Sequence, residues 1–292
     1  MIVTGANRGL GLAMARALGA RAATVHLVVR DAAAGAAARE AVVAAGARAA
    51  EVHVCDVGDA AAVRAFAARF EARALPLAAL VLNAGFIAKA HALSRDGLEP
   101  SWAAAVLQSY LLVALLAPSL ARAAAAHPAR TPAARVVHVS SGGGLTVGVD
   151  AADAQGAARA ARGAFDGALQ YAHAKRAQMA LARAWARRLP RGVGSYSMHP
   201  GWADTDGVRT SLPDFHAARA GTLRTAEQGA DTAVWLAAAP ALPEGVNGAL
   251  FFDRAVAREH FPLAGTRGPR DEEAAWELAE RAVGAAWEGG AR

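Results

Sequence analysis

The sequence is poor in cysteine, with Cys55 as the single thiol among 292 residues. One thiol cannot form an internal disulfide, so we expect a fold without a disulfide framework and a reducing, cytoplasmic location. The nine histidines are scattered, and no pair has metal-ligand spacing along the chain. The sequence therefore predicts no metal site.

Lysine is almost as scarce, with only Lys89 and Lys175. The formal net charge is +6, but the arginines are spread singly and in pairs, without a run of five or more basic residues. We therefore expect no nucleic-acid partner. Alanine, glycine and arginine dominate the composition in a way typical of coding bias. A lysine or asparagine that remains in such a sequence is therefore a candidate functional residue.

A long uninterrupted apolar run is also missing. The most apolar stretch, 106–126, contains Gln108, Pro118 and Arg122, which favours a buried helix over a transmembrane segment. No signal-peptide pattern precedes the first expected strand. That strand starts at Met1 itself, so we expect that an N-terminal segment is absent from this sequence.

The first eleven residues carry the strongest positive pattern. Apolar and β-branched residues lead into Gly5, Gly9 and Gly11, and an apolar periodic stretch follows. Strand, glycine turn and helix in this order are typical of a nucleotide-binding motif, in which the helix N-terminus faces a pyrophosphate. The alternative is an ordinary turn between a strand and a helix, because the chain contains 29 glycines.

Apolar strands alternate with helical patterns along the rest of the chain. Further strands are expected at 24–29, 51–56, 77–82, 135–139, 194–198 and 249–252. This alternation predicts a single-domain α/β fold, a doubly wound parallel sheet of the Rossmann type in three α/β/α layers. We assign 1–255 to this domain, including an irregular loop at 203–224, and 256–292 to a tail with an amphipathic helix near 271–283.

Ligands of such sheets bind beyond the carboxyl ends of the strands. The unusual residues of this sequence follow the expected strand ends: the glycine turn, Arg30, Asp56, Asn83, Ser141 and Pro200-Gly201. Their common position predicts one binding site.

Tyr171 and Lys175 form a second motif. Their spacing of four places both side chains on one face of an expected helix. A phenol has a pKa of about 10, and a nearby ammonium lowers it, so the pair suits proton transfer. The alternative is a solvated helix face.

Together, Thr4-Gly-Ala-Asn-Arg-Gly-Leu-Gly11, Asn83-Ala-Gly85, Ser141, Tyr171-x-x-x-Lys175 and Pro200-Gly201 resemble the short-chain dehydrogenase/reductase (SDR) family. The glycine spacing is similar to that of its single-domain branch. The resemblance implies an oxidoreductase in which Tyr171 is the general acid–base and Ser141 binds the substrate oxygen, supported by Ser140. Lys175 would lower the pKa of Tyr171 and hold the nicotinamide ribose.

The resemblance also implies the contacts to the cofactor. The expected cofactor-binding residues are Gly5, Asn7, Arg8, Gly9, Leu10, Gly11, Arg30, Asp56, Val57, Asn83, Ala84, Gly85, Tyr171, Lys175, Pro200, Gly201, Trp202 and Thr205. We expect NADP(H), because Val29 ends the second strand where a carboxylate would bind a ribose 2′-hydroxyl. Arg30 and Arg8 could instead bind a 2′-phosphate. Asp31 comes one position too late in the sequence for its carboxylate to bind the ribose 2′-hydroxyl.

One residue departs from the family pattern, because Ala105 stands where a catalytic asparagine is expected. We expect slow NADP(H)-dependent interconversion of a lipophilic carbonyl and alcohol, with a proton-relay water held by the main chain or by Ser109. The alternative is a non-catalytic NADP(H)-binding sensor or scaffold. The loop 203–224 would cover the substrate through Trp202, Leu212 and Phe215, unless these residues form ordinary core. The sequence leaves homo-oligomerisation open.

Overall fold

The computed structural model describes all residues except 95, 130–131, 212, 220, 262–270 and 290–292. Its centre is one twisted sheet with the strand order β3-β2-β1-β4-β5-β6-β7-β8. The strands are β1 (Ile2–Thr4), β2 (Val25–Val29), β3 (Ala50–Val54), β4 (Ala79–Leu82), β5 (Ala134–Val139), β6 (Val193–Met198), β7 (Leu250–Phe252) and β8 (Ala255–Val256). The doubly wound sheet is thereby confirmed, with β1 between β2 and β4.

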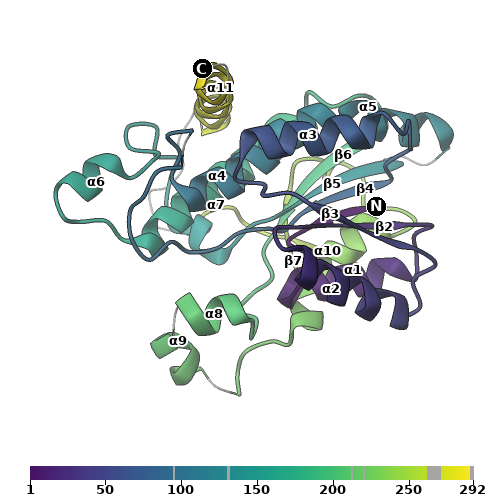
Figure 1. Cartoon of the computed structure of the whole chain (residues 1–292), viewed down its shortest axis with the longest axis horizontal. Coiled ribbons are helices and arrows are strands. Elements are labelled where there is room, and N and C mark those ends of the chain that lie inside the picture. The colour runs from purple at the N-terminus through teal and green to yellow at the C-terminus, as the bar shows by residue number, and fades with distance from the viewer. Residues whose placement is uncertain (95, 130–131, 212, 220, 262–270, 290–292) are drawn as a thin grey trace.

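Helices cover both faces of the sheet (Figure 1). One face carries α1 (Gly9–Gly19), α2 (Ala32–Ala44) and α10 (Ala226–Ala238). The other carries α3 (Ala60–Glu71), α4 (Pro100–Leu107), α5 (Val113–Ala126) and α7 (Gly167–Ala186). Each layer of helices shares a buried apolar cluster with its face of the sheet, which accounts for the mainly apolar composition of the central strands.

Polar caps begin several helices where the sequence suggests. Asp59 accepts a hydrogen bond from the Ala62 amide at the start of α3. Thr225 and Gln228 form a capping box at the start of α10. Asp31 caps α2 by accepting from the Ala34 amide at 2.7 Å. Because these bonds are local, the sequence predicts such helix starts well.

Helix α4 continues through a π-turn, Gln108–Leu112, into α5. The continuous helical run Pro100–Ala126 is longer than the helix expected from the sequence. It is long and apolar enough to cross a membrane, and 72% of its most apolar window is buried inside the protein.

The loop 203–224, expected to be irregular, contains short helices, and so does the stretch 145–165. The stretch 145–165 includes α6 (Ala157–Ala161), and 203–224 includes α8 (Asp206–Ser211) and α9 (Pro213–Ala218). Five or six residues are too few to show helical periodicity, so the sequence pattern missed them. The short strand β8 was also missed, and it pairs antiparallel with β7.

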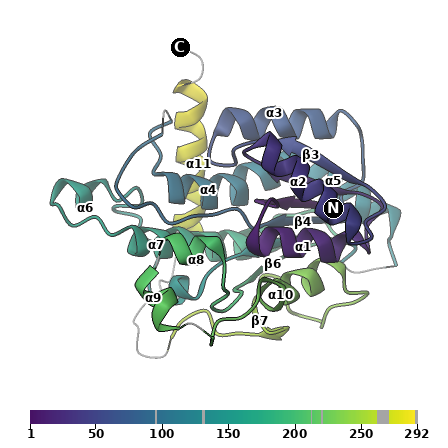
Figure 2. The same ribbon diagram turned by 60° about the horizontal axis from the view of Figure 1, so that its bottom comes forward.

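The amphipathic helix near the C-terminus is present as α11 (Asp271–Gly289). Figure 2 shows it beside α4 and α7. Ala275 and Ala279 on this helix are buried in the same core as α4 and α7. The Arg176 guanidinium of α7, fully buried, lies 2.7 Å from the Asp271 carboxylate. The helix is therefore an integral part of the folded unit.

Candidate active site

A cavity of about 790 Å³ opens at the carboxyl ends of the parallel strands. All of the residues predicted for the site line it: Gly5, Asn7, Arg8, Gly9, Leu10, Gly11, Arg30, Asp56, Val57, Asn83, Ala84, Gly85, Ser141, Tyr171, Lys175, Pro200, Gly201, Trp202 and Thr205. The parallel sheet brings these residues together because its strands all end at one edge. Their individual roles stay predictions.

The glycine turn has the backbone that its sequence requires. Gly5 and Gly9 have φ of +64° and +51°, the left-handed region that favours glycine. A Cβ on Gly11 would lie only 2.1 Å from the Gly5 carbonyl oxygen, so α1 packs against the turn only because Gly11 has no side chain. A Cβ on Gly9 would come no closer than 3.5 Å to Thr205, so there is room for a side chain at this position. Position 9 therefore requires glycine because of its positive φ and not because of close packing.

A buried polar network fixes this turn to the end of β4. Thr4 Oγ1 accepts from the Asn83 and Ala84 amides at 2.9 and 3.0 Å and donates to Gln108 Oε1 at 2.7 Å. The Asn83 amide group donates back to the Thr4 carbonyl at 2.9 Å. Asn83 therefore supports the turn, and the buried Gln108 of the π-turn is a supporting residue that the sequence analysis missed.

Tyr171 and Lys175 project from α7 into the cavity. Lys175 is 1% exposed, and its Nζ lies 5.5 Å from the centre of the Tyr171 ring. The ammonium donates to the Val139 carbonyl at 2.8 Å and to Gln178 Oε1 at 2.9 Å. These contacts exclude the solvated helix face as the setting of the pair.

Ser140 and Ser141 follow β5 on the same side of the cavity. Ser140 Oγ donates to the Lys175 carbonyl at 3.0 Å, which ties the end of β5 to α7. Ser141 Oγ accepts from the Gly143 amide at 3.3 Å and is half-buried at the cavity wall. Both serines line the cavity, but Ser140 is buried and bonded to α7, whereas Ser141 is only half-buried.

Burial dominates the protonation of the Tyr171–Lys175 pair. It raises the pKa of the Tyr171 phenol to about 12 and lowers that of the Lys175 ammonium to about 7. The expected lowering of the Tyr171 pKa by Lys175 is not found, because desolvation disfavours the charged form of both groups. Tyr171 is therefore a protonated phenol at neutral pH.

A line of hydrogen bonds leads from Lys175 into the interior. Gln178 Nε2 donates to Ser109 Oγ at 3.0 Å, and Ser109 Oγ lies 3.2 Å from His138 Nδ1. Burial lowers the pKa of His138 to about 3, so this ring is neutral. Ser109 thus lies in a chain with Lys175, whereas Ala105 is buried without a polar side chain. Gln178 was missed, although its spacing of three from Lys175 is a helical-face signal.

The opposite end of the cavity carries Arg30. Its guanidinium carbon lies 5.6 Å from the centre of the Phe86 ring. Asp31 is occupied as the cap of α2, and Asp56 Oδ1 accepts from the Gly58 amide at 2.9 Å. Burial raises the pKa of the neighbouring Cys55 thiol to about 12. Cys55 therefore lines the cavity as an uncharged thiol.

The segment that follows β6 forms another part of the cavity wall. Trp202 is 52% exposed and packs on Phe215, with the ring centres 4.2 Å apart. This exposure rules out ordinary core packing for Trp202; Leu212 lies outside the described residues. The Arg224 guanidinium donates to the Pro200 carbonyl at 3.4 Å and to Asp253 Oδ1 at 2.6 Å, which anchors the segment to the sheet.

A glycine turn after a central parallel strand, with a Tyr–Lys pair in the same cavity, defines the dinucleotide-dependent class of oxidoreductases. The short chain dehydrogenase family matches residues 1–165. The chain belongs to the short-chain dehydrogenase/reductase family.

Individual relatives cover nearly the whole chain. Bovine (Bos taurus) dehydrogenase/reductase SDR family member 12 is 40% identical over 96% of this chain and 84% of its own length. Human (Homo sapiens) retinol dehydrogenase 12 is 32% identical over 99% of this chain and 87% of its own. The structure of a 3-oxoacyl-(acyl-carrier-protein) reductase from Agrobacterium tumefaciens with NADP bound is 26% identical, with a TM-score of 0.61 over 81% of this chain and 86% of the other.

Proposed function

We propose that this SDR oxidoreductase interconverts a lipophilic carbonyl and alcohol with NADP(H), using Tyr171 as general acid–base. The observation that carries the proposal is the placement of Tyr171 and Lys175 in the same cavity as the glycine turn and Arg30. A proton donor and a dinucleotide cradle in one cavity are what carbonyl reduction requires.

The cavity fits a dinucleotide. Gly5 and Gly9 keep the backbone of the turn free of side chains, and the amides at the start of α1 offer a site for phosphate oxygens. The exposed Arg8 precedes α1 and makes no capping bond with its side chain. The group that these residues would hold supplies hydride chemistry at the nicotinamide.

The choice of NADP(H) rests on the charges near the end of β2. Val29 offers no carboxylate to a ribose 2′-hydroxyl, and the Asp31 carboxylate is engaged with the Ala34 amide. Arg30 and Arg8 both line the cavity as cations. A 2′-phosphate is the dianionic group that suits such arginines.

In the reductive direction Tyr171 donates its phenolic proton to the substrate oxygen, which Ser141 also hydrogen-bonds. The high pKa of Tyr171 keeps this proton in place at neutral pH. Lys175 holds the ribose side and returns a proton to Tyr171, and its bond to Gln178 connects it to Ser109. The residues of this chain thus position the reactants and handle the proton.

A lipophilic substrate is supported by the outer wall of the cavity. Ile87, Trp202 and Val208 line it, and Trp202 exposes half of its surface there. Retinol dehydrogenase 12 is similar to this protein over almost the entire chain. That relative is named for retinol, which is a lipophilic alcohol. We further propose a cytoplasmic location and no transmembrane segment, since the long apolar helix is mostly buried by the protein itself.

A non-catalytic NADP(H)-binding protein is the second candidate, and Ala105 is the observation that favours it. Without the polar side chain expected there, proton return depends on the Gln178–Ser109 chain. The two candidates differ in one measurement, because a sensor binds NADPH without consuming it.

The test is NADPH oxidation against retinoid, steroid and aliphatic carbonyls by the parent and by Tyr171→Phe. We expect Tyr171→Phe to lower kcat about 10²- to 10⁴-fold while the Kd for NADPH changes little, because only the proton donor is lost. Tyr110→Phe is the matched control, since Tyr110 belongs to the π-turn, does not line the cavity and donates its hydroxyl proton to Glu280 of α11. Equal activity of Tyr171→Phe and the parent would contradict the assigned acid, and an inert parent that binds NADPH would favour the sensor.

A further inference from the structure

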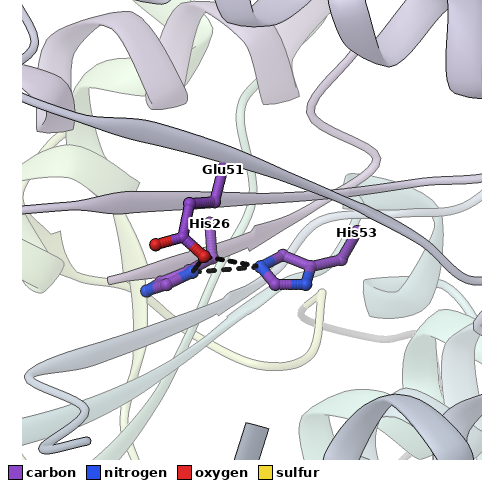
Figure 3. Close-up of side chains that lie close together, drawn as sticks. All are labelled: His26, Glu51 and His53. Atoms are coloured by element: carbon purple, nitrogen blue, oxygen red, sulfur yellow. Dashed lines mark hydrogen bonds and ion pairs between the residues drawn. The ribbon is translucent and has the colours of Figure 1, made fainter. Parts of the chain in front are cut away.

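Three potential metal ligands meet on the edge strand β3 and its neighbour β2, outside the cavity just described. These strands pair in parallel with His26 opposite Glu51. Glu51 and His53 are two residues apart on β3, so both point to the same face as His26. Figure 3 shows the two imidazoles and the carboxylate turned toward one another.

The distances between the ligand atoms suit one small cation. His26 Nδ1 lies 3.0 Å from His53 Nε2 and 3.6 Å from Glu51 Oε2, and the last pair, His53 Nε2 and Glu51 Oε2, is 3.9 Å apart. Ligands at ~2.0–2.1 Å from a tetrahedral Zn²⁺ are separated by roughly 3.3 Å. The three separations bracket this value, so the ion needs only small side-chain shifts.

The surroundings hold the two rings in place. Phe70 of α3 meets the His26 ring edge-on at 5.1 Å, and Phe66 meets the His53 ring at 5.1 Å. The His26 side chain is 4% exposed and that of His53 is 17% exposed, whereas 39% of the Glu51 side chain is exposed. The cluster thus has a packed inner side and an open outer side for entry of the ion and of one water ligand.

The two imidazoles already face each other through the nitrogens that would bind the ion. His26 Nδ1 and His53 Nε2 are 3.0 Å apart, so one N–H lies between them. Moving that N–H to the other nitrogen of its ring frees the second lone pair for a metal ion.

We propose that His26, Glu51 and His53 bind one divalent transition-metal ion of the zinc type. Two imidazole nitrogens and one carboxylate oxygen are ligands that zinc accepts, with a water as the fourth. None of the three residues lines the cavity that holds Tyr171. The ion would connect β2 to β3 and so act as a structural clip. The proposal departs from the expectation of no metal, which rested on spacing along the chain, because His26 and His53 are 27 positions apart in the sequence.

Arg73 is the built-in competitor of this ion. Its guanidinium donates to both Glu51 oxygens, at 2.5 Å to Oε2 and 2.9 Å to Oε1. A bound cation must share the carboxylate with this positive charge. Replacing Arg73 therefore has the opposite effect on metal affinity from replacing a ligand, which gives the proposal a second, independent signature.

The experiment uses the full chain, stripped with EDTA and dialysed against Co²⁺ and then Zn²⁺. We expect one equivalent of Co²⁺ with the intense visible absorption of tetrahedral coordination, displaced by Zn²⁺. His53→Gln and Glu51→Gln should each weaken binding at least tenfold, while Arg73→Gln should tighten it. His127→Gln replaces an exposed histidine outside the cluster and should bind like the parent.

Circular dichroism shows whether each variant is folded, and only folded variants are compared. His53→Gln and Glu51→Gln are the informative pair, because both side chains are partly exposed and their replacement leaves the core intact. The proposal is overturned if the folded parent takes up no stoichiometric metal. It is equally overturned if His53→Gln and Glu51→Gln bind as the parent does, or if Arg73→Gln weakens binding as much as the loss of a ligand.

Discussion

Arg30 is the residue that we expect to select NADP(H) over NAD(H). A charge-assisted hydrogen bond contributes about 1.5–3 kcal/mol to binding. Because Arg30 is exposed to solvent, we expect its bond to a 2′-phosphate to contribute toward the lower end of this range. Arg30→Ala should therefore lower the NADP/NAD affinity ratio about tenfold, measured by fluorescence titration with both reduced cofactors. Arg16→Ala removes an exposed arginine outside the cavity and is the charge-matched control. An unchanged ratio in Arg30→Ala would refute the assignment.

Lys175 should determine how carbonyl reduction depends on pH. In the proposed mechanism, reduction consumes a proton that Lys175 returns to Tyr171, and burial lowers the pKa of Lys175 to about 7. The ammonium is lost as the pH rises through this value, so the reductive rate should fall above pH 7. An asparagine at position 105 adds a polar group that can hold a relay water.

Ala105→Asn should accordingly raise the reductive kcat, most clearly above pH 7, in a stopped-flow or steady-state pH profile. Its bulk in the packed interior should also lower stability by about 1–3 kcal/mol. Ala105→Val is the matched control, because it adds similar volume without hydrogen bonding. Equal pH profiles for the asparagine and valine variants would show that Ser109 and the main chain already suffice.

Among the elements, α11 shows how a buried ion pair attaches a helix to the core. The Arg176 side chain is fully buried and also donates to the Glu259 carbonyl at 2.8 Å. Asp271→Ala leaves this guanidinium without its carboxylate, so we expect a loss of about 3–5 kcal/mol in the free energy of unfolding by urea. Glu277→Ala removes only the exposed partner of Arg281 and should change stability by less than about 0.5 kcal/mol. A loss in Asp271→Ala no larger than this would contradict the inferred anchoring.

The elements also separate what local chemistry determines from what it does not. The starts of α2, α3 and α10 follow from Asp31, Asp59 and Thr225, whose side chains bond amides only a few residues away. The π-turn has no such local mark. There the Gln108 side chain bonds the Ala104 carbonyl four positions earlier and also Thr4, 104 positions earlier, a contact that only the fold provides.

For the whole molecule, cofactor binding should stabilise the folded state. The cavity takes residues from the ends of β1 through β6, so one ligand contacts both halves of the sheet. NADPH at 100 times its Kd should add about 2.7 kcal/mol to the free energy of unfolding. The melting temperature should rise by roughly 4 °C, measured by scanning calorimetry, and NADH at the same concentration should raise it less. No rise with NADPH would show that the cavity does not bind it.

The sequence by itself determined the order of the main strands and helices, the glycine turn, the Tyr171–Lys175 pair and the edge of the sheet at which these residues gather. These features follow from short-range periodicity and from the rule that parallel strands end together. Only the tertiary structure decided which distant side chains meet. Strand register places His26 opposite Glu51, and helix packing brings Gln178 to Ser109. Such contacts depend on how the whole chain packs, which local sequence patterns do not encode.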